Sequence, residues 1–162
     1  MRDCASVLGA LSSCAQHTHD RDMLARTAVD AIANQLPQAG WTGVYWLERD
    51  ALVLGPFVGP PTEHVRIPVG TGVCGTAVAE DRDQVVDDVR KRPNYLACSP
   101  SVRSEIVVLI RQGGRVVGQI DVDSDRVAAF STSDHAFLKM VAGALGSLIP
   151  PVRGSAASSA VR

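Results

Sequence analysis

The chain has 162 residues, of which 46% are hydrophobic, and its 16 basic and 17 acidic residues give a formal net charge of −1. This length predicts one domain whose core needs no metal or disulfide framework. The balanced charge argues against nucleic acid and anionic membranes as partners. No apolar run approaches the roughly 20 residues of a membrane helix, and no apolar secretory stretch opens the sequence, which predicts a cytoplasmic protein.

The first 36 residues are expected to form two helices. Apolar residues recur at helical spacing between residues 3 and 16. Asp20 is placed to cap a second helix that runs to about residue 36. Cys4 and Cys14 fall in the first helix, where free cysteine packs as a small hydrophobe.

The central part, residues 41–124, predicts an antiparallel sheet followed by a last helix. Strands are expected at 41–48, 51–57, 64–69, 84–89, 105–111 and 115–123, with a short helix at 73–80 and a loop at 90–101. The last helix spans about 132–149 and is capped by one of residues 131–133, and the small polar tail at 151–162 is expected to be disordered. Together these elements predict an α+β domain over residues 1–150, with the helices on one face of the sheet.

The carboxylates of the last two strands are the first candidate site. Asp121 and Asp123 alternate with apolar residues and therefore share one face. If Glu105 joined them, carboxylates on adjacent strands would raise each other's pKa, and one could hold a proton near neutrality. A solvated sheet face is the alternative reading.

The turn between these strands decides where Glu105 points. A two-residue turn at Gly113 and Gly114 would send Glu105 to the face opposite Asp121. A three-residue loop at 112–114 that ends in a glycine bulge would pair Arg111 with Arg115 and set Glu105 beside Asp121. We choose the second register because it gathers the acidic residues on one face.

Two cysteines and two aromatic residues complete the candidates. Cys98 lies between a proline-containing loop and a β-branched strand, where it can act as a nucleophile at a pocket rim. A zinc set of Cys74, Cys98 and His64 lacks paired short spacing, so no metal is expected. Trp41 and Tyr45 share a strand face; they either pack in the core or form the wall of a ligand site.

Several segments resemble one family in order and spacing between about residues 40 and 124. They are Trp-Thr-Gly-Val-Tyr at 41–45, Leu-Gly-Pro-Phe at 54–57, Gly-Thr-Gly-Val-Cys-Gly-Thr-Ala at 70–77, Ala-Cys-Ser-Pro at 97–100, Ser-Glu-Ile-Val-Val at 104–108 and Ile-Asp-Val-Asp-Ser at 120–124. This set is similar to the free methionine-(R)-sulfoxide reductases, which are built on a single GAF domain. The resemblance implies a GAF-like antiparallel sheet and reduction of free L-methionine (R)-S-oxide to L-methionine.

The resemblance also implies roles for individual residues. Cys98 aligns with the catalytic cysteine and Cys74 with a recycling cysteine. The acidic substrate-site positions align with Glu105, which can act as the acid, and with Asp121 and Asp123. Trp41 and Tyr45 would surround the methylsulfinyl end of the substrate. In this scheme a Cys98 sulfenic acid forms, Cys74 closes a disulfide, and thioredoxin or a similar dithiol reduces it without a further cofactor.

Two departures from the family pattern stand out. His64 occupies a place where the family commonly carries another cysteine, so resolution by Cys74 alone is expected. Ser99 replaces the aspartate that usually follows the nucleophile. A non-catalytic GAF sensor that binds a small molecule stays open as an alternative, and a homodimer through the terminal helices is compatible with either reading.

Overall fold

The computed structural model describes residues 1–93, 95 and 99–153. Cys98 and residues 154–162 of the predicted tail lie outside the described residues. The described chain forms one six-stranded sheet in the order β3-β2-β1-β6-β5-β4, and each neighbouring pair is antiparallel. The strands are β1 (Trp41–Glu48), β2 (Ala51–Val58), β3 (Arg66–Pro68), β4 (Gln84–Val86), β5 (Ser104–Gln112) and β6 (Arg115–Ser124).

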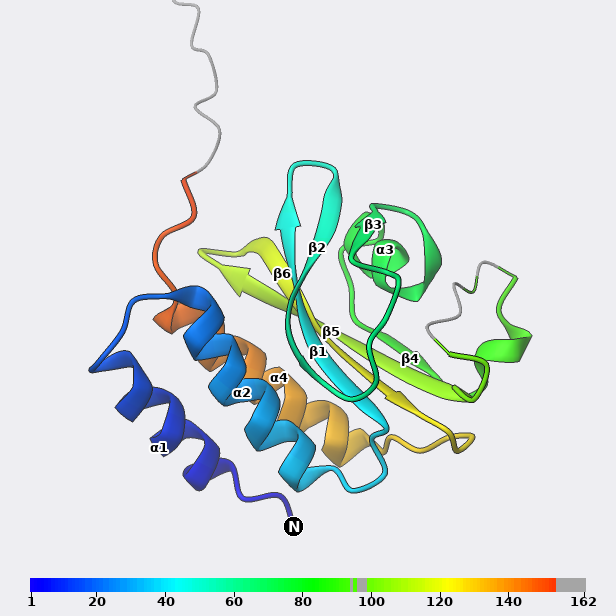
Figure 1. The fold of residues 1–162 in the computed structure, drawn as a ribbon, viewed down its shortest axis with the longest axis horizontal. Helices are drawn as coiled ribbons and strands as arrows, with labels where there is room; N and C mark the ends of the chain where they lie inside the picture. The colour runs from blue at the N-terminus through cyan, green and yellow to red at the C-terminus, as the bar shows by residue number, and fades with distance from the viewer. Residues whose placement is uncertain (94, 96–98, 154–162) are drawn as a thin grey trace, which may run out of the picture.

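Three long helices lie on one side of this sheet: α1 (Cys4–Ala15), α2 (Arg21–Gln35) and α4 (Thr132–Leu148). Two of them, α2 and α4, cover its face and α1 packs against both, as Figure 1 shows. The apolar sides of α2 and α4 pack on alternate residues of the central strands, and α1 joins the same apolar cluster; the strand residues include Ile106, Val108, Ile110, Ile120 and Val122. This helical layer confirms the predicted α+β fold. None of the described helices combines the length and apolar character needed to cross a bilayer.

The opposite face is also covered. The short helix α3 (Gly72–Ala79) packs against β5, and residues such as Val73 and Ala77 join Tyr45 and Leu109 in a second apolar cluster. Glu105 is 4% exposed and Asp121 is 0% exposed. The solvated-face reading of the acidic residues is therefore wrong.

The turn between β5 and β6 differs from the predicted one. Gly113 and Gly114 have φ of +57° and +78° and form a two-residue turn that pairs Gln112 with Arg115. Glycine adopts these left-handed angles without the steric penalty of a Cβ. The predicted three-residue loop, with Arg111 opposite Arg115, is wrong.

A bulge further along the hairpin restores the predicted faces. Ile110 lies opposite Gly118 while Arg111 lies opposite Val116, so Val117 is an extra residue on β6. One extra residue reverses the alternation of side chains beyond it. Glu105 consequently shares a face with the acidic residues of β6, as predicted, although its direct partner across the ladder is Asp123 rather than Asp121.

Two predicted strands are shorter than expected. β3 covers only Arg66–Pro68 of the predicted 64–69, and β4 covers only Gln84–Val86 of the predicted 84–89. β4 ends because the chain turns into a short 3₁₀ helix, η1 (Val89–Lys91). The Asp88 carboxylate caps this helix by accepting a hydrogen bond from the Arg90 backbone at 3.1 Å.

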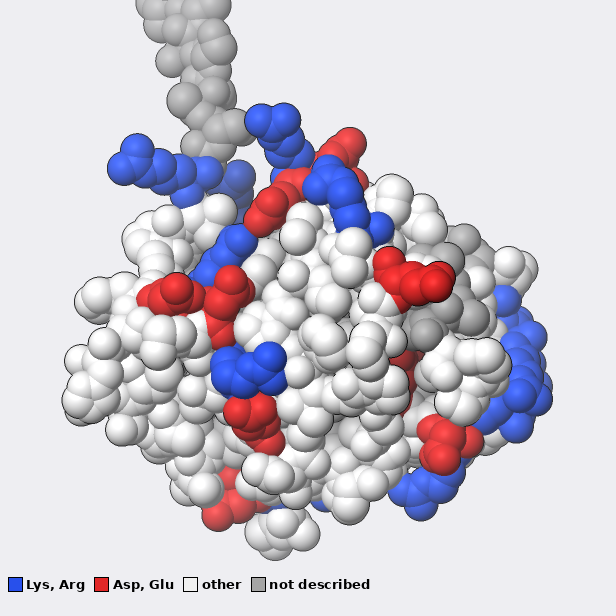
Figure 2. All heavy atoms as spheres, in the orientation of Figure 1, with Lys and Arg blue, Asp and Glu red and all other residues white. Residues whose placement is uncertain are grey.

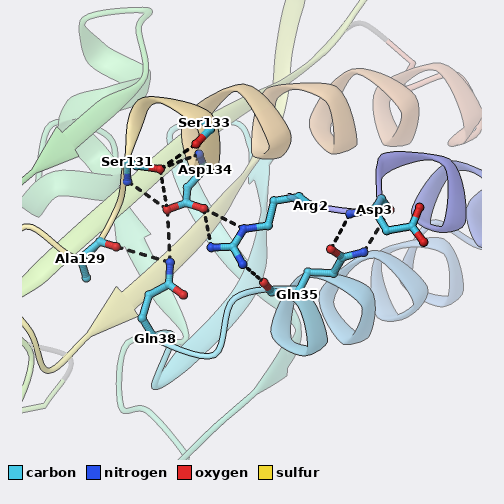
Figure 3. Close-up of polar contacts among 8 residues, drawn as sticks. All are labelled: Arg2, Asp3, Gln35, Gln38, Ala129, Ser131, Ser133 and Asp134. Atoms are coloured by element: carbon cyan, nitrogen blue, oxygen red, sulfur yellow. Dashed lines mark hydrogen bonds and ion pairs between the residues drawn. The ribbon is translucent and has the colours of Figure 1, made fainter.

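A polar cluster ties the N-terminus to the start of α4 (Figure 3). Ser131 and Asp134 form a reciprocal capping box, and the Asp134 carboxylate also pairs with the Arg2 guanidinium at 2.7 Å. Arg2 donates a further hydrogen bond to the Gln35 carbonyl at the end of α2. Burial alone would raise the pKa of Asp134, but hydrogen bonds from Ser131 and Arg2 outweigh it and lower that pKa. One carboxylate thus joins all three helices of the layer.

We expect Asp134→Ala to lower the free energy of unfolding by about 2 kcal/mol, because buried donors lose their acceptor. In a domain of this size that corresponds to a fall in melting temperature of roughly 4–8 °C, measured by circular dichroism at pH 7. Asp30→Ala is the control, because the Asp30–Arg26 pair is exposed and should contribute under about 0.5 kcal/mol. Equal effects of the two substitutions would contradict the tethering role of Asp134.

Candidate active site

Three acidic side chains meet on the face of the sheet that α3 covers. Glu105 lies in β5 directly opposite Asp123 of β6, and Asp121 lies one alternation step further along β6, between Val107 and Gly43. Their exposed fractions are 4% for Glu105, 1% for Asp123 and 0% for Asp121. The structure therefore brings together all three predicted acidic residues in a buried cluster.

Cys74 reaches this cluster from α3. Its Sγ lies 3.3 Å from Oδ2 of Asp121 and 3.8 Å from Oε1 of Glu105, within hydrogen-bond range for a thiol. The neighbouring Gly75 allows α3 to sit this close to the preceding turn, because a Cβ there would lie 2.5 Å from the Pro68 carbonyl oxygen. The result is a buried thiol that donates to a carboxylate.

Burial dominates the electrostatics of the cluster. It raises the pKa of Glu105 well above the usual value, and the negative charges of Asp121 and Asp123 raise it further. Burial also raises the pKa of Asp121, to about 6, although hydrogen bonds from Cys74 and Glu105 oppose the shift. The pKa of Asp123 is raised by burial and by the charge of Asp121. The cluster consequently holds at least one proton near neutral pH.

Asp123 also lines a cleft of about 420 Å³. Neither oxygen of its carboxylate, nor Oδ1 of Asp121, has a hydrogen-bond partner among the described residues. The cleft walls combine apolar and polar groups, which include Trp41, Pro60, Pro61, Ser99, Val102 and Ser124. A buried carboxylate without a partner is costly, and a ligand cation such as an ammonium group would satisfy it.

The two aromatic residues have different surroundings. The Trp41 ring lines the cleft, stacks on Phe57 with centroids 5.6 Å apart, and donates from Nε1 to the Pro60 carbonyl at 3.1 Å. Tyr45 is 0% exposed, is absent from the cleft lining, and donates its hydroxyl to the His64 carbonyl at 2.8 Å. Trp41 is thus placed as a wall, whereas Tyr45 packs in the apolar cluster beneath it.

Two further residues of this face escaped the sequence analysis. Gly43 faces Asp121 across the β1–β6 ladder, and a Cβ at Gly43 would lie 2.7 Å from Cζ3 of Trp41, so only glycine leaves room for the indole. Gln119 is 0% exposed, and its amide oxygen and nitrogen both lack partners within the described part of the chain. The period-2 alternation places Gln119 on the acidic face, but nothing in the sequence marks it as buried.

The described residues contain one cluster with the geometry of a cation site. Single ligand atoms of Cys74, Glu105 and Asp121 all lie within 4.8 Å of one another. His64 is not part of this cluster, and Cys98 lies outside the described residues. Structural zinc sites use four ligands and catalytic ones add an open position to three. The prediction that this site works without a metal stands as a prediction.

Cys98, the predicted nucleophile, lies outside the described residues, but its neighbour in the chain does not. Ser99 lines the cleft together with Asp123, and the backbone N–H of Val102 closes a turn on the Ser99 carbonyl at 3.2 Å. The prediction that Cys98 acts as a nucleophile at the rim of a pocket stays a prediction.

Comparison with known proteins places this architecture in a family. A family model described as "GAF domain" matches residues 18–149. The protein YtsP of Bacillus subtilis is 36% identical over 146 residues, which are 89% of each chain. The free methionine-R-sulfoxide reductase of Escherichia coli is 40% identical over 111 residues, which are 68% of this chain and 67% of that one.

A solved structure agrees with these sequence matches. The X-ray structure of the free methionine-R-sulfoxide reductase from Neisseria meningitidis in complex with its substrate superposes with a TM-score of 0.80 at 35% identity, over 88% of this chain and 86% of that one. The chain thus belongs to the GAF domain family. Within that family it is closely related, at about 40% identity, to the free methionine-R-sulfoxide reductases, which confirms the resemblance drawn from the sequence.

The buried acidic cluster predicts a stability that depends on pH. Because the folded-state pKa of Asp121 is raised to about 6, the folded state binds more protons than the unfolded chain between about pH 4 and 6. The contribution of Asp121 to the free energy of unfolding is thus fully present below about pH 4 and is lost as the pH rises through about 6. We expect Asp121→Asn to stabilise the ligand-free protein by on the order of 1–3 kcal/mol at pH 8 and by little at pH 4.

Urea unfolding at several pH values measures this effect. The control is Asp125→Asn, because Asp125 is exposed at the cleft rim and should change stability by less than about 0.5 kcal/mol at either pH. A stability gain from Asp121→Asn that is equal at pH 4 and pH 8 would show that charge burial is not its cause.

Proposed function

We propose that this chain reduces free L-methionine (R)-S-oxide to L-methionine, and that thioredoxin or a similar dithiol regenerates it. The observation that carries the proposal is the Cys74 thiol, which hydrogen-bonds to the buried carboxylates of Glu105 and Asp121, beside Asp123 of the cleft lining. The close relationship to free methionine-R-sulfoxide reductases supports the same reaction.

The cleft offers a physical reason for preferring the free amino acid. Free methionine sulfoxide carries an α-ammonium group, which peptide-bound methionine lacks. The Asp123 carboxylate, which has no hydrogen-bond partner within the described part of the chain, lines the cleft and is suited to this cation. The indole of Trp41 forms an apolar wall there, against which the methyl group of the substrate can pack.

The first step transfers oxygen to the protein. The Cys98 sulfur attacks the sulfoxide sulfur, and Glu105, whose pKa is raised by burial, acts as the acid that protonates the sulfoxide oxygen. The protonated oxygen then passes from the substrate sulfur to the Cys98 sulfur, so the sulfur–oxygen bond of the substrate and the newly formed sulfur–sulfur bond both break. Methionine leaves with the electron pair of the sulfur–sulfur bond. The net result is a Cys98 sulfenic acid, so Cys98 is oxidised by two electrons and the methionine sulfur is reduced by two.

The second step uses Cys74 to close a disulfide. The Cys74 sulfur attacks the sulfur of the Cys98 sulfenic acid and passes its proton to Asp121, whose Oδ2 lies 3.3 Å away. The hydroxyl group of the sulfenic acid takes a proton from solvent and leaves as water. The dithiol reductant then reduces the disulfide through a mixed disulfide and is itself oxidised to a disulfide.

Two cysteine substitutions test this scheme. Cys98→Ser should abolish methionine release, whereas Cys74→Ser should release one equivalent of methionine per chain and then turn over with thioredoxin at least about tenfold more slowly, since the sulfenic acid lacks its resolving thiol. The measurements are chromatographic methionine release in a single turnover and thioredoxin-coupled NADPH oxidation.

Cys14→Ser is the matched control, because Cys14 lies in α1 on the other side of the sheet, and it should keep wild-type rates. The S epimer should not react. If the wild type releases no methionine from the R epimer, the reductase proposal fails, and retained binding of the substrate would then identify a non-catalytic GAF sensor.

The role of Asp123 is tested by comparing a substrate that has an α-ammonium group with one that lacks it. Asp123→Asn should raise the KM for the free substrate by roughly 10- to 100-fold, because the substrate ammonium loses a charge-assisted hydrogen bond. The same substitution should leave the slow reaction of N-acetylmethionine sulfoxide unchanged, because that compound has no ammonium group.

Asp125→Asn, the exposed neighbour at the cleft rim, serves as the control and should change KM by less than about threefold, because solvent screens exposed charges. Parallel losses with the free and the acetylated substrate would mean that Asp123 supports the fold or the chemistry rather than the ammonium group.

A further inference from the structure

A basic surface lies beside the segment that carries Cys98. Arg90, Lys91 and Arg92 are consecutive and exposed, and they form the end of η1 and the residue after it. Figure 2 shows Lys and Arg gathered at the edge of the molecule where Figure 1 places η1. We call these three residues the η1 basic patch.

The charges of this patch are partly compensated. Within the described residues, neither Arg90 nor Lys91 forms an ion pair, and Arg92 donates to the neutral Gln84 amide oxygen at 2.6 Å. The Asp88 carboxylate pairs with Arg103 at 3.4 Å and also interacts electrostatically with Lys91, and Glu80 interacts in the same way with Arg92. The patch therefore presents positive charge to an approaching partner.

The fold holds this patch close to the redox site. The Val89 N–H donates to the Arg103 carbonyl at 2.8 Å, and the Arg103 N–H donates to the Ser124 carbonyl at 2.8 Å. The start of η1 is thus joined through Arg103 to Ser124 at the end of β6, next to Asp123. In the sequence, Arg92 lies six positions before Cys98.

Burial of Cys74 determines where a reductant must approach. Cys74 is 4% exposed beneath α3, so an external thiolate reaches a Cys74–Cys98 disulfide through the Cys98 sulfur. The thiolate bonds to Cys98, the electron pair of the disulfide passes to Cys74, and Cys74 takes a proton from Asp121. A second partner thiol then displaces Cys98, and the partner leaves as a disulfide oxidised by two electrons.

We propose that the η1 basic patch is the docking surface for an acidic protein that carries the reducing dithiol; this inference rests on the proposed reductase function. A standard protein interface covers about 800 Å² per partner and is roughly 30 Å across. Because η1 is hydrogen-bonded to Arg103, which follows Val102 of the cleft lining, a protein that docks over this cleft can contact the patch as well. Complementary charge then speeds association and orients the partner, whereas a small uncharged dithiol gains nothing from it.

The chain contains two lysines, Lys91 and Lys139, and they give a matched pair of variants. Lys91 lies in the patch, whereas the exposed Lys139 lies on α4, which covers the other face of the sheet. The experiment compares Lys91→Glu with Lys139→Glu, using an acidic thioredoxin and, separately, dithiothreitol as reductant. Single-turnover methionine release is measured for each protein first.

At low ionic strength, Lys91→Glu should raise the KM for thioredoxin by about fivefold or more, and added salt should shrink the difference. Methionine release and the dithiothreitol rate should match the wild type, and Lys139→Glu should behave as the wild type throughout. The double variant Arg90→Glu/Lys91→Glu should show a larger rise.

The experiment distinguishes failure of the reductase function from failure of the docking surface. If the wild type releases no methionine, the reductase function itself fails. If release is normal and Lys91→Glu leaves the KM for thioredoxin unchanged, the docking surface is overturned. A rate loss with dithiothreitol equal to that with thioredoxin would also overturn it, because the charge would then act on the chemistry.

Discussion

The site depends on burying three carboxylates on one face of a sheet without a basic side chain among the described residues to neutralise them. Removing an ionised carboxylate from water costs several kcal/mol unless it is paired or protonated. Here the raised pKa values of Glu105 and Asp121 show how the cost is reduced, because shared protons and the Cys74 thiol replace a counter-ion. The same arrangement supplies proton donors and acceptors beside a sulfur atom.

The two faces of the sheet divide the work between stability and chemistry. On one face, three helices form a continuous apolar core with the sheet, and the polar Arg2–Asp134 cluster links the N-terminus to α4. The other face combines a smaller apolar cluster with the acidic residues and the cleft. A site that buries charged groups lowers the free energy of unfolding, and the fold tolerates it when other parts of the structure are stable enough to offset that loss. Here the helical layer provides the offsetting stability.

The sequence predicted those features that local rules govern. The alternation along β6 placed Asp121 and Asp123 on one face, and Asp20 was recognised as the cap of α2, where its carboxylate accepts from the backbones of Asp22 and Met23. These features depend on neighbours within a few residues. Hydrogen-bonding and side-chain periods are enough to find them.

Other features depended on tertiary structure and could not be read in advance. The position of the bulge at Val117 has no residue signature, because a β-branched residue is equally at home in a regular strand. The burial of Gln119 and the contact between Cys74 and Asp121 require α3 to lie over the sheet. The use of Gly43 to seat the Trp41 indole appears only when both side chains are placed.

The extra residue in the β5–β6 hairpin restricts how sequences of this kind can diverge. The number of residues between Glu105 and the acidic residues of β6 determines the face toward which Glu105 points. The extra residue Val117 gives the number that puts them on the same face. Many substitutions in the hairpin would leave this number intact, whereas a one-residue deletion or insertion would turn Glu105 toward the helices, into a core of Ile120 and Val122. The hairpin can therefore vary in composition far more readily than in length.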